Sequence, residues 1–224
     1  MNIYLIIPSY NEDQRLHWLL KKTAHYFPLS KTIVVDDGSI NPVRLRQNTP
    51  AILIRHQINL GKGAAMKTGA QFAFKNGAQA IIFMDADGQH DPKELPLFKK
   101  YLNKNYDLIL GSRRLGLDAP FLRMLGNKFT ALYVSLLFNI YVSDILSGYR
   151  ALTHKAYQLL KWDSDRYGVE TEIIARLGKY KKQLKWLEIP IETIYMDKYK
   201  GVTIIQAIKI LVNSLWWKLS WAFK

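Results

Sequence analysis

The chain has 224 residues, of which 49% are hydrophobic, and this is enough to bury the core of one domain of ordinary size. It contains 32 Lys and Arg residues against 18 Asp and Glu, and the formal net charge of +14 favours anionic partners such as nucleotides, nucleic acid or an acidic membrane surface. There is no cysteine, which excludes disulfides, thiolate metal sites and a cysteine nucleophile.

Short apolar runs recur along the first half of the chain, with helical patterns between several of them. The N-terminus turns polar after Ile7 and lacks a basic leader, so we expect no signal peptide. Strand–helix alternation with apolar strands predicts an α/β fold, a mostly parallel sheet covered by helices on both faces. The predicted strands are residues 3–7, 32–35, 51–54, 80–84 and 107–110, and the predicted helices are residues 12–26, 62–74 and 92–102.

A polar cluster follows each of these five strands. Ligands of open parallel sheets bind beyond the carboxyl ends of the strands, so we expect the five clusters to form one site. The clusters are PSYNE at residues 8–12, DDGS at 36–39, NLGKG at 59–63, DAD at 85–87 and GSR at 111–113.

Two of the clusters carry paired carboxylates. Asp85 and Asp87 are separated by one residue, so both can face one ion, and carboxylate oxygens suit Mg²⁺ or Mn²⁺. The alternative is a polar exit from a strand. Asp36 and Asp37 could accept hydrogen bonds from a base or a ribose, although Asp-Gly is also a common turn pair.

The glycine-rich segment at residues 59–69 does not match the P-loop pattern, because no Ser or Thr follows Lys62 directly. Its helix start could still meet a phosphate, or the small residues Ala64, Ala65 and Gly69 could serve close packing. Arg113 could clamp a phosphate, as could Arg123 further along, although the alternative for any single arginine is a solvated surface charge. The five histidines show no metal-binding spacing, and we expect them to be structural or exposed.

The last third of the chain has a different pattern. Residues 121–141 are apolar and aromatic, residues 184–190 predict a strand, and residues 202–223 predict a helix with a roughly amphipathic pattern. Lys209 and Lys218 would each add roughly 2.5–3.5 kcal/mol to membrane spanning, so we expect this helix to lie in the membrane interface. The alternative is a helix packed in the core or in a dimer. The nearby lysines expected to favour anionic lipid are Lys179, Lys181, Lys182 and Lys185.

Taken together, PSYNE, VVDDGS, NLGKGAAMKTG, MDADGQHDP, GSR and the later SGYRA resemble the family 2 glycosyltransferases of GT-A fold. The branch that looks most similar transfers sugars to polyprenyl phosphates such as dolichyl or undecaprenyl phosphate. The resemblance covers about residues 1–195 and implies an inverting, metal-dependent enzyme at the cytoplasmic face of the membrane. It implies a catalytic domain at residues 1–200, followed by an interfacial segment at 201–224.

The resemblance also implies roles for single residues. Glu170 and Glu172 match an acidic pair on the helix after the acceptor region. The donor nucleotide sugar would be bound by Pro8, Tyr10, Glu12, Asp36, Asp37, Lys62, Asp85 and Asp87. The Mg²⁺ or Mn²⁺ ion would be bound by Asp85, Asp87 and Gln89, and the acceptor phosphate by Arg113, Arg123 and Asn127. Asp87, Arg113 and Arg123 would be the catalytic residues.

The chain departs from the family pattern where relatives often carry Ser-Lys after a basic-Gly element, because Val202 and Thr203 follow Lys200 and Gly201 here. Lys198 or Lys200 could replace that contact to the donor phosphates. The alternative function is sugar transfer to a saccharide hydroxyl in cell-envelope polysaccharide synthesis. A remote alternative is non-enzymatic binding of nucleic acid. We expect no nucleic-acid partner, since no nucleic-acid motif accompanies the charge. A membrane-protein partner or a homo-oligomer is compatible with the sequence.

Overall fold

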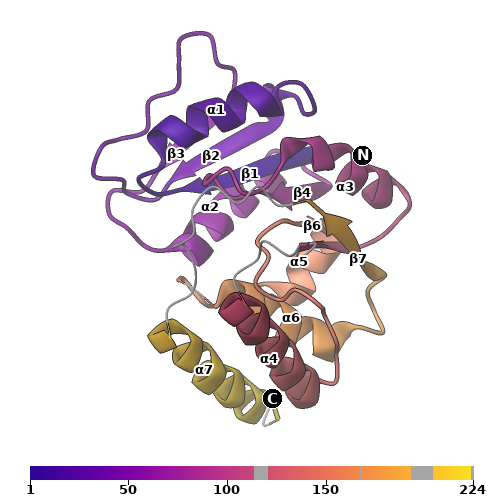
Figure 1. Ribbon diagram of the computed structural model, residues 1–224. Helices are drawn as coiled ribbons and strands as arrows, with labels where there is room; N and C mark the ends of the chain where they lie inside the picture. The colour runs from indigo at the N-terminus through magenta and orange to yellow at the C-terminus, as the bar shows by residue number, and fades with distance from the viewer. Residues whose placement is uncertain (114–120, 167, 193–203, 223–224) are drawn as a thin grey trace.

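The computed structural model describes residues 1–113, 121–166, 168–192 and 204–222, with residues 121–127, 204–208, 210 and 221–222 described by their backbone alone. In this part of the chain seven strands form one sheet in the order β3-β2-β1-β4-β6-β5-β7 (Figure 1). The strands are β1 (Ile3–Ser9), β2 (Thr32–Asp36), β3 (Ile52–Arg55), β4 (Ala80–Phe83), β5 (Leu108–Arg113), β6 (Arg150–Thr153) and β7 (Trp186–Ile191).

All six strands predicted from apolar runs are present, each within three residues of its expected ends. The three expected helices of the first half are also present, although the third begins as a short 3₁₀ turn, Pro92–Glu94, which Asp91 caps by accepting a hydrogen bond from the Lys93 amide. The helices are α1 (Asp13–Thr23), α2 (Lys62–Lys75), α3 (Leu95–Asn103), α4 (Phe121–Phe138), α5 (His154–Leu160), α6 (Val169–Tyr180) and α7 (Ile204–Ala222).

The sheet separates two hydrophobic cores, which confirms the expected coverage of both faces. Alternate strand residues point to opposite faces, so Leu5 and Ile7 lie in one core and Ile6 lies in the other. Helices α1 and α3 cover the first face, while α2, α5 and α6 cover the second (Figure 1). Leu16 and Leu19, on the predicted apolar stripe of α1, are fully buried.

Strand β6 is the main element that apolar runs did not predict. It has four residues, and it pairs antiparallel with both β4 and β5, whereas the other four strand pairs are parallel. Because β6 runs in the opposite direction, its first residue, Arg150, lies at the edge where the parallel strands end. The SGYRA segment at residues 147–151 therefore meets the clusters of the first half of the chain.

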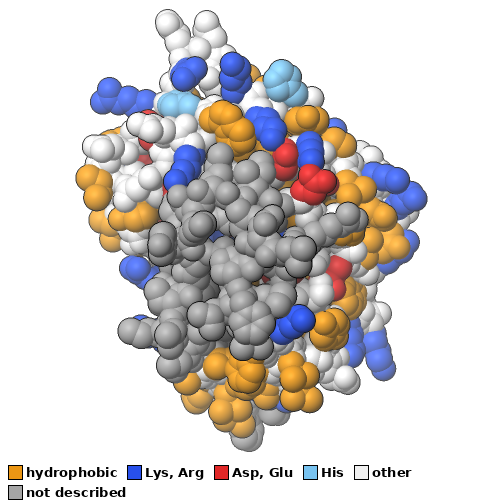
Figure 2. All heavy atoms as spheres, in the orientation of Figure 1, with side chains coloured by type: hydrophobic (Ala, Val, Ile, Leu, Met, Phe, Trp, Pro, Cys, Tyr) orange, Lys and Arg blue, Asp and Glu red, His pale blue; other side chains and the backbone are white. Residues whose placement is uncertain are grey.

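Helix α7 packs against α4 and α6, and the Tyr133 hydroxyl of α4 donates to the Leu211 carbonyl at 3.0 Å. Ser214 of α7 is fully buried, whereas the exposed side of α7 carries both apolar and polar residues: Trp216 is 67% exposed, and Lys209 and Lys218 are also exposed. Leu136 on α4 is 77% exposed, and Figure 2 shows hydrophobic side chains gathered at this end of the molecule. None of the described helices has the length and apolar character needed to cross a membrane.

Candidate active site

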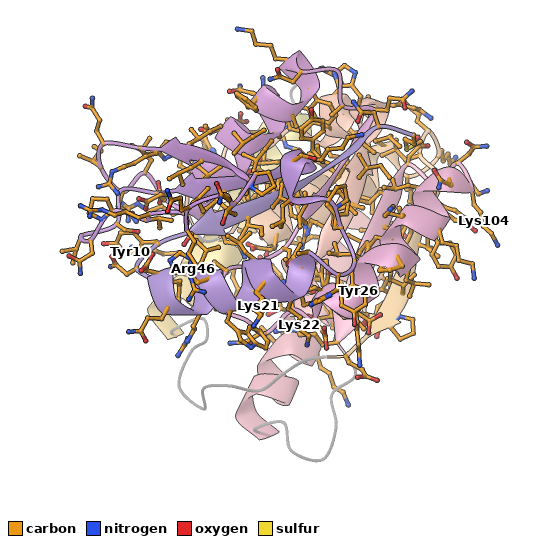
Figure 3. The ribbon with its side chains drawn as sticks, turned by 90° about the horizontal axis from the view of Figure 1, so that it is seen from above. Tyr10, Lys21, Lys22, Tyr26, Arg46 and Lys104 are labelled. Atoms are coloured by element: carbon orange, nitrogen blue, oxygen red, sulfur yellow. The ribbon has the colours of Figure 1, made fainter. Side chains whose placement is uncertain are left out.

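The predicted clusters lie along one edge of the sheet. The parallel register places Ser9 of β1 beside Asp36 of β2, and Asp36 beside Arg55 of β3. Figure 3 shows Tyr10 at this edge and Lys104 at the opposite one. The polar residues that follow the strands are therefore neighbours in space, as the strand pattern predicted.

Asp36 is fully buried and is held by protein groups on several sides. It accepts hydrogen bonds from the amides of Ser39 at 3.0 Å and Val43 at 3.1 Å, and it forms an ion pair with Arg55. Burial raises the pKa of Asp36, but the hydrogen bonds from Ser39, Val43 and Arg55 outweigh it and hold the pKa below its ordinary value. The carboxylate of Asp36 thus fixes the turn after β2.

Asp37 is also buried, and it fastens the glycine-rich segment to the end of β2. Its carboxylate accepts from the amides of Leu60 at 3.0 Å and Gly61 at 2.7 Å, and one oxygen lies 2.8 Å from His56 Nδ1. The other ring nitrogen of His56 lies 2.9 Å from the Thr68 hydroxyl of α2. Both acids predicted to bind the nucleotide therefore have protein partners, and a nucleotide contact stays a prediction.

The PSYNE segment ends β1 and turns sharply at Asn11, whose φ is 56°. The Asn11 amide donates to the Ser39 hydroxyl at 2.9 Å and its side-chain oxygen accepts from the Ile40 amide at 3.0 Å, so the ends of β1 and β2 are joined. Pro8 is buried and Tyr10 is exposed. An open pocket of about 460 Å³ adjoins this turn, lined by Asn11, Glu12, Asp13, Gln14, Arg15, Ile40 and Asn41.

Asp85 lies next to a lysine and a second acid that come from distant parts of the chain. Lys62 Nζ lies 2.7 Å from Asp85 Oδ1, 2.9 Å from Asp85 Oδ2 and 2.7 Å from Glu170 Oε1. Burial opposes the charged form of both partners, but their mutual attraction outweighs it: the pKa of Lys62 is raised and that of Asp85 falls to about 2. The Lys62 ammonium, predicted to contact the donor, is thus engaged by two carboxylates.

Asp87 and Gln89 are half-buried beside this cluster. Asp87 Oδ1 accepts from the Gln89 amide at 3.0 Å, which fixes the turn and orients the carboxylate. In the described residues no group of three or more His, Asp and Glu side chains converges as a metal cage. Two carboxylates and an amide oxygen nevertheless fit Mg²⁺ or Mn²⁺, which commonly keep waters and take further ligands from phosphate.

His90 and Asp91 were given no role from the sequence; in the structure His90 supports the turn that carries Asp85 and Asp87, and Asp91 holds the segment that follows it. His90 Nδ1 accepts from the Asp85 amide at 3.0 Å, and its ring stacks on Tyr149 with centroids 4.8 Å apart. Burial lowers the pKa of His90, in agreement with an unprotonated Nδ1 that acts as an acceptor. Asp91 is buried and pairs with Lys22 at 2.9 Å.

Arg113 ends β5 and is held by an acid that sequence reasoning missed. Its Nε and Nη2 donate to the two oxygens of Asp144 at 2.6 and 2.8 Å, and its amide donates to Asp144 Oδ2 at 3.1 Å. Asp144 is 31 residues away and belongs to the loop before β6, so only the antiparallel strand brings it here. Arg123 and Asn127 lie on α4, but their side chains fall outside the described residues, as do Lys198 and Lys200.

The glycine-rich segment packs against the loop before α6. A Cβ atom on Gly63 would lie 2.0 Å from the Ser164 carbonyl oxygen, and the Trp162 ring nitrogen donates to the Gly63 carbonyl at 2.9 Å. The Ala64 amide donates to the Asp165 carbonyl at 2.9 Å. Close packing, one of the two predicted roles, is therefore present at this helix start and at Gly69, where a Cβ atom would lie 2.5 Å from Ile6 Cγ2.

The acidic pair of α6 divides between two roles. Glu170 contacts Lys62, as described above. Glu172 is fully buried and accepts from the amides of Asp163 and Ser164 at distances of 2.9 to 3.2 Å, while Arg176 donates to it at 2.8 Å. Glu172 thus holds the loop that contacts the glycine-rich segment, and only Glu170 faces the cluster around Asp85.

Comparison with known proteins identifies the family. The family model described as glycosyl transferase family 2 matches residues 4–162. UDP-N-acetylglucosamine–dolichyl-phosphate N-acetylglucosaminyltransferase of Methanococcus voltae is 29% identical, over 97% of this chain and 96% of its own. Undecaprenyl-phosphate mannosyltransferase of Micrococcus luteus is 28% identical, over 98% of this chain and 95% of its own.

The fold has a match among solved structures. The glucosyl-3-phosphoglycerate synthase of Mycobacterium tuberculosis aligns with a TM-score of 0.74 over 97% of this chain and 78% of its own, at 15% identity. That structure contains Mn²⁺, UDP and phosphoglyceric acid. The matched residues and the sheet with its strand-end clusters agree: the chain belongs to glycosyl transferase family 2 and has the GT-A fold that its motifs predicted.

Proposed function

We propose that the protein transfers a sugar from a nucleoside diphosphate sugar to a polyprenyl phosphate at a membrane surface, with inversion. The observation that carries this proposal is the presence, at one sheet edge, of the Asp85–Asp87 turn and of an arginine fixed by Asp144. Relatives named for dolichyl-phosphate and undecaprenyl-phosphate transfer, which align along almost the whole chain, support the acceptor class.

The donor would lie beyond the ends of β1, β2 and β4. Tyr10 is exposed at this edge, where its ring could stack on a base, and Glu12 lines the adjoining pocket. Asp36 and Asp37 would act mainly through the turns they fix, because their oxygens have protein partners. A UDP-sugar and GDP-mannose are the donor classes that we expect.

A divalent ion, Mg²⁺ or Mn²⁺, would be held by Asp87 with Asp85 and Gln89, and when bound it would neutralise charge on the leaving diphosphate. The fold neighbour that contains Mn²⁺ and UDP supports this choice. His90 keeps the turn in place through its bond from the Asp85 amide. The protein's own part is to hold the turn that carries Asp85, Asp87 and Gln89 in position before the donor arrives.

Arg113 would receive the acceptor phosphate. Asp144 contacts Nε and Nη2 of its guanidinium, which fixes the plane of the group at the end of β5. A lipid phosphate is largely ionised near neutral pH, since its second pKa is about 6, so it needs no general base. A phosphate oxygen would attack the anomeric carbon as the bond to the diphosphate oxygen breaks on the opposite face, with Arg123 and Asn127 as further predicted contacts.

The membrane would meet the exposed apolar surface of α4 and α7. The large apolar side chains that are at least 48% exposed on these two helices are Phe129, Leu132, Leu136, Val212, Leu215, Trp216 and Leu219. A peripheral position at the membrane agrees with this surface, and we propose that it is on the cytoplasmic face. We therefore propose a catalytic domain at residues 1–200 and an interfacial segment at 201–224, whose helix α7 is braced by α4.

A donor panel tests the proposal. Purified protein with Mn²⁺ or Mg²⁺ and a short undecaprenyl phosphate is incubated with labelled UDP-glucose, UDP-N-acetylglucosamine or GDP-mannose, and lipid-linked label is counted. We expect transfer from at least one donor and none after chelation with EDTA. Folded protein that transfers no sugar from any of a wider set of donors contradicts the proposal.

A further inference from the structure

Lys62 occupies the point at which two carboxylates from distant parts of the chain converge. It begins α2, whereas Asp85 follows β4 and Glu170 lies in the first turn of α6. The ammonium has three N–H donors, and three carboxylate oxygens lie within 2.9 Å of it: both of Asp85 and one of Glu170. Its hydrogen-bonding capacity is therefore used within the protein.

The surroundings are shaped for this contact. Gly148, in the loop before β6, lies so close that a Cβ atom there would be 2.6 Å from Asp85 Oδ2 and 2.7 Å from Lys62 Nζ. Glu170 is buried, and Arg150, which is also buried, places a second positive charge near both carboxylates. Three segments of the chain besides its own thus surround the ammonium, which stays partly exposed.

A position between two carboxylates is also one that a divalent cation could take. Oxygen ligands from Asp85 and Glu170 suit Mg²⁺ or Mn²⁺, and an ammonium placed between them both fills the space and repels a second cation. A bound nucleoside diphosphate would offset this repulsion, because its negative charge attracts the divalent cation that binds beside Lys62.

We propose that Lys62 is a positioning residue that keeps divalent metal from binding between Asp85 and Glu170, so that the metal binds tightly only together with the donor diphosphate. The inference rests on the proposed function, since it takes the donor to be a nucleoside diphosphate sugar. It assigns Glu170 the role of second anchor for the lysine. Asp87, which Lys62 does not contact in the described structure, stays available for the metal that arrives with the donor.

The competing explanation is that the cluster is only a buried ion pair that stabilises the fold. Such a pair would affect unfolding but would give no reason for metal affinity to increase when the lysine is removed. Metal affinity in the absence of nucleotide therefore separates the two explanations, and it needs neither a sugar donor nor a lipid acceptor.

The test is a titration of the full chain with Mn²⁺, in which free Mn²⁺ is measured by electron paramagnetic resonance. The proteins are wild type, Lys62→Met and the control Lys67→Met. The control removes one lysine charge from the same helix, where Lys67 pairs with the exposed Asp165 at 3.4 Å. Without nucleotide we expect Lys62→Met to bind Mn²⁺ at least about tenfold more tightly than wild type and the control. Equal affinity in all three proteins overturns the inference.

Two further variants guard against a misfolded Lys62→Met protein. Lys62→Gln removes the charge but retains amide donors, and it is expected to bind Mn²⁺ more tightly as well. In Lys62→Met/Glu170→Gln one of the converging carboxylates is neutral, so the gain in affinity should disappear. A gain that persists in the double variant overturns the role given to Glu170.

Titrations repeated with UDP and with GDP separate this inference from the proposed function. We expect wild type to bind Mn²⁺ at least about tenfold more tightly with its preferred diphosphate, and Lys62→Met to show a smaller increase. Wild-type affinity that is already tight without nucleotide contradicts the inference. If neither diphosphate binds while Lys62→Met still gains affinity for Mn²⁺, the proposed donor is wrong and the exclusion of metal by Lys62 stands.

Discussion

Two acid pairs follow buried strands of the same sheet, and they differ in how many protein donors they meet. Asp36 and Asp37 accept bonds from four backbone amides and lie against Arg55 and His56. Asp87, in the second pair, accepts from the Gln89 amide and is half-buried. An acidic pair at a strand end therefore marks a structural turn at β2 and a candidate ligand site at β4, where Asp85 is held by Lys62 and Asp87 has fewer protein donors.

The largest expected effect comes from Asp87→Asn, which removes a charge from the second pair while keeping its shape. We expect sugar transfer to fall by roughly 100- to 1,000-fold, because charge stabilisation at the leaving group is lost. The midpoint of thermal unfolding should stay within a few degrees of wild type, since few protein contacts depend on this carboxylate. Asp36→Asn is the matched control and should chiefly lower the unfolding midpoint. Equal loss of stability in both variants would remove the distinction between the pairs.

Glycines beside the two pairs sharpen the comparison. Gly38 has a φ of 69°, and a Cβ atom there would lie 2.4 Å from the Ile58 carbonyl carbon, so Gly38→Ala should lower the free energy of unfolding by about 2–3 kcal/mol. At Gly148 the close atoms are the ends of the Asp85 and Lys62 side chains, which can move. Gly148→Ala should therefore lower the rate of sugar transfer, while its free energy of unfolding should fall by less than that of Gly38→Ala. Urea unfolding measures the free energy of unfolding, and initial rates measure sugar transfer. A larger loss of unfolding free energy in Gly148→Ala than in Gly38→Ala contradicts the assignment.

Asp144→Asn tests whether a buried acid serves the candidate site through Arg113. Loss of the charged, two-point contact should let the guanidinium move and lower transfer by roughly 10- to 100-fold, mostly through the KM for the lipid phosphate. Asp144→Glu should recover part of the activity. A variant whose KM values for lipid and donor rise equally would show that Asp144 has only a general structural role.

Arg55→Met is expected to have the smallest effect, because Arg55 is partly exposed and Asp36 keeps two amide donors. We expect the free energy of unfolding of Arg55→Met to be lower than that of wild type by about 1–2 kcal/mol at pH 7. The folded-state pKa of Asp36 is lowered, so its ionised form contributes stability above the unfolded pKa of about 4, and this contribution is lost as the pH falls below that value. The difference in the free energy of unfolding between variant and wild type, measured in urea, should thus become smaller from pH 7 to pH 3. An unchanged difference at pH 3 contradicts the role given to the ionised Asp36 carboxylate.

The sequence predicted the parts of this molecule that depend on local pattern. The apolar runs of β1, β2 and β4 and the stripe of Leu16 and Leu19 on α1 were sufficient to place the strand-end clusters at one edge. Strand β6 was missed because it has four residues and no alternation of its own. Its antiparallel direction could not be inferred from a pattern typical of parallel sheets.

Long-range side-chain contacts explain the rest of what was missed. Asp144 has its role only because β6 returns to the edge beside β5, and His90 has its role only through the Asp85 amide and the Tyr149 ring. Lys62 was predicted to bind the donor, but its contact with Glu170, 108 residues away, depends on how α6 packs. Helix α7 was expected to be amphipathic, and its contact with α4, which leaves Trp216 exposed, is a tertiary property.

The central claim is that the acceptor nucleophile is a lipid phosphate held near Arg113. The most direct test compares initial rates of sugar transfer to a short polyprenyl phosphate and to the matching polyprenol, with the same donor, metal and detergent. We predict transfer to the phosphate and at least about a 1,000-fold lower rate with the alcohol, which is neutral and lacks a general base in this mechanism. Equal rates with the two lipids would contradict the claim.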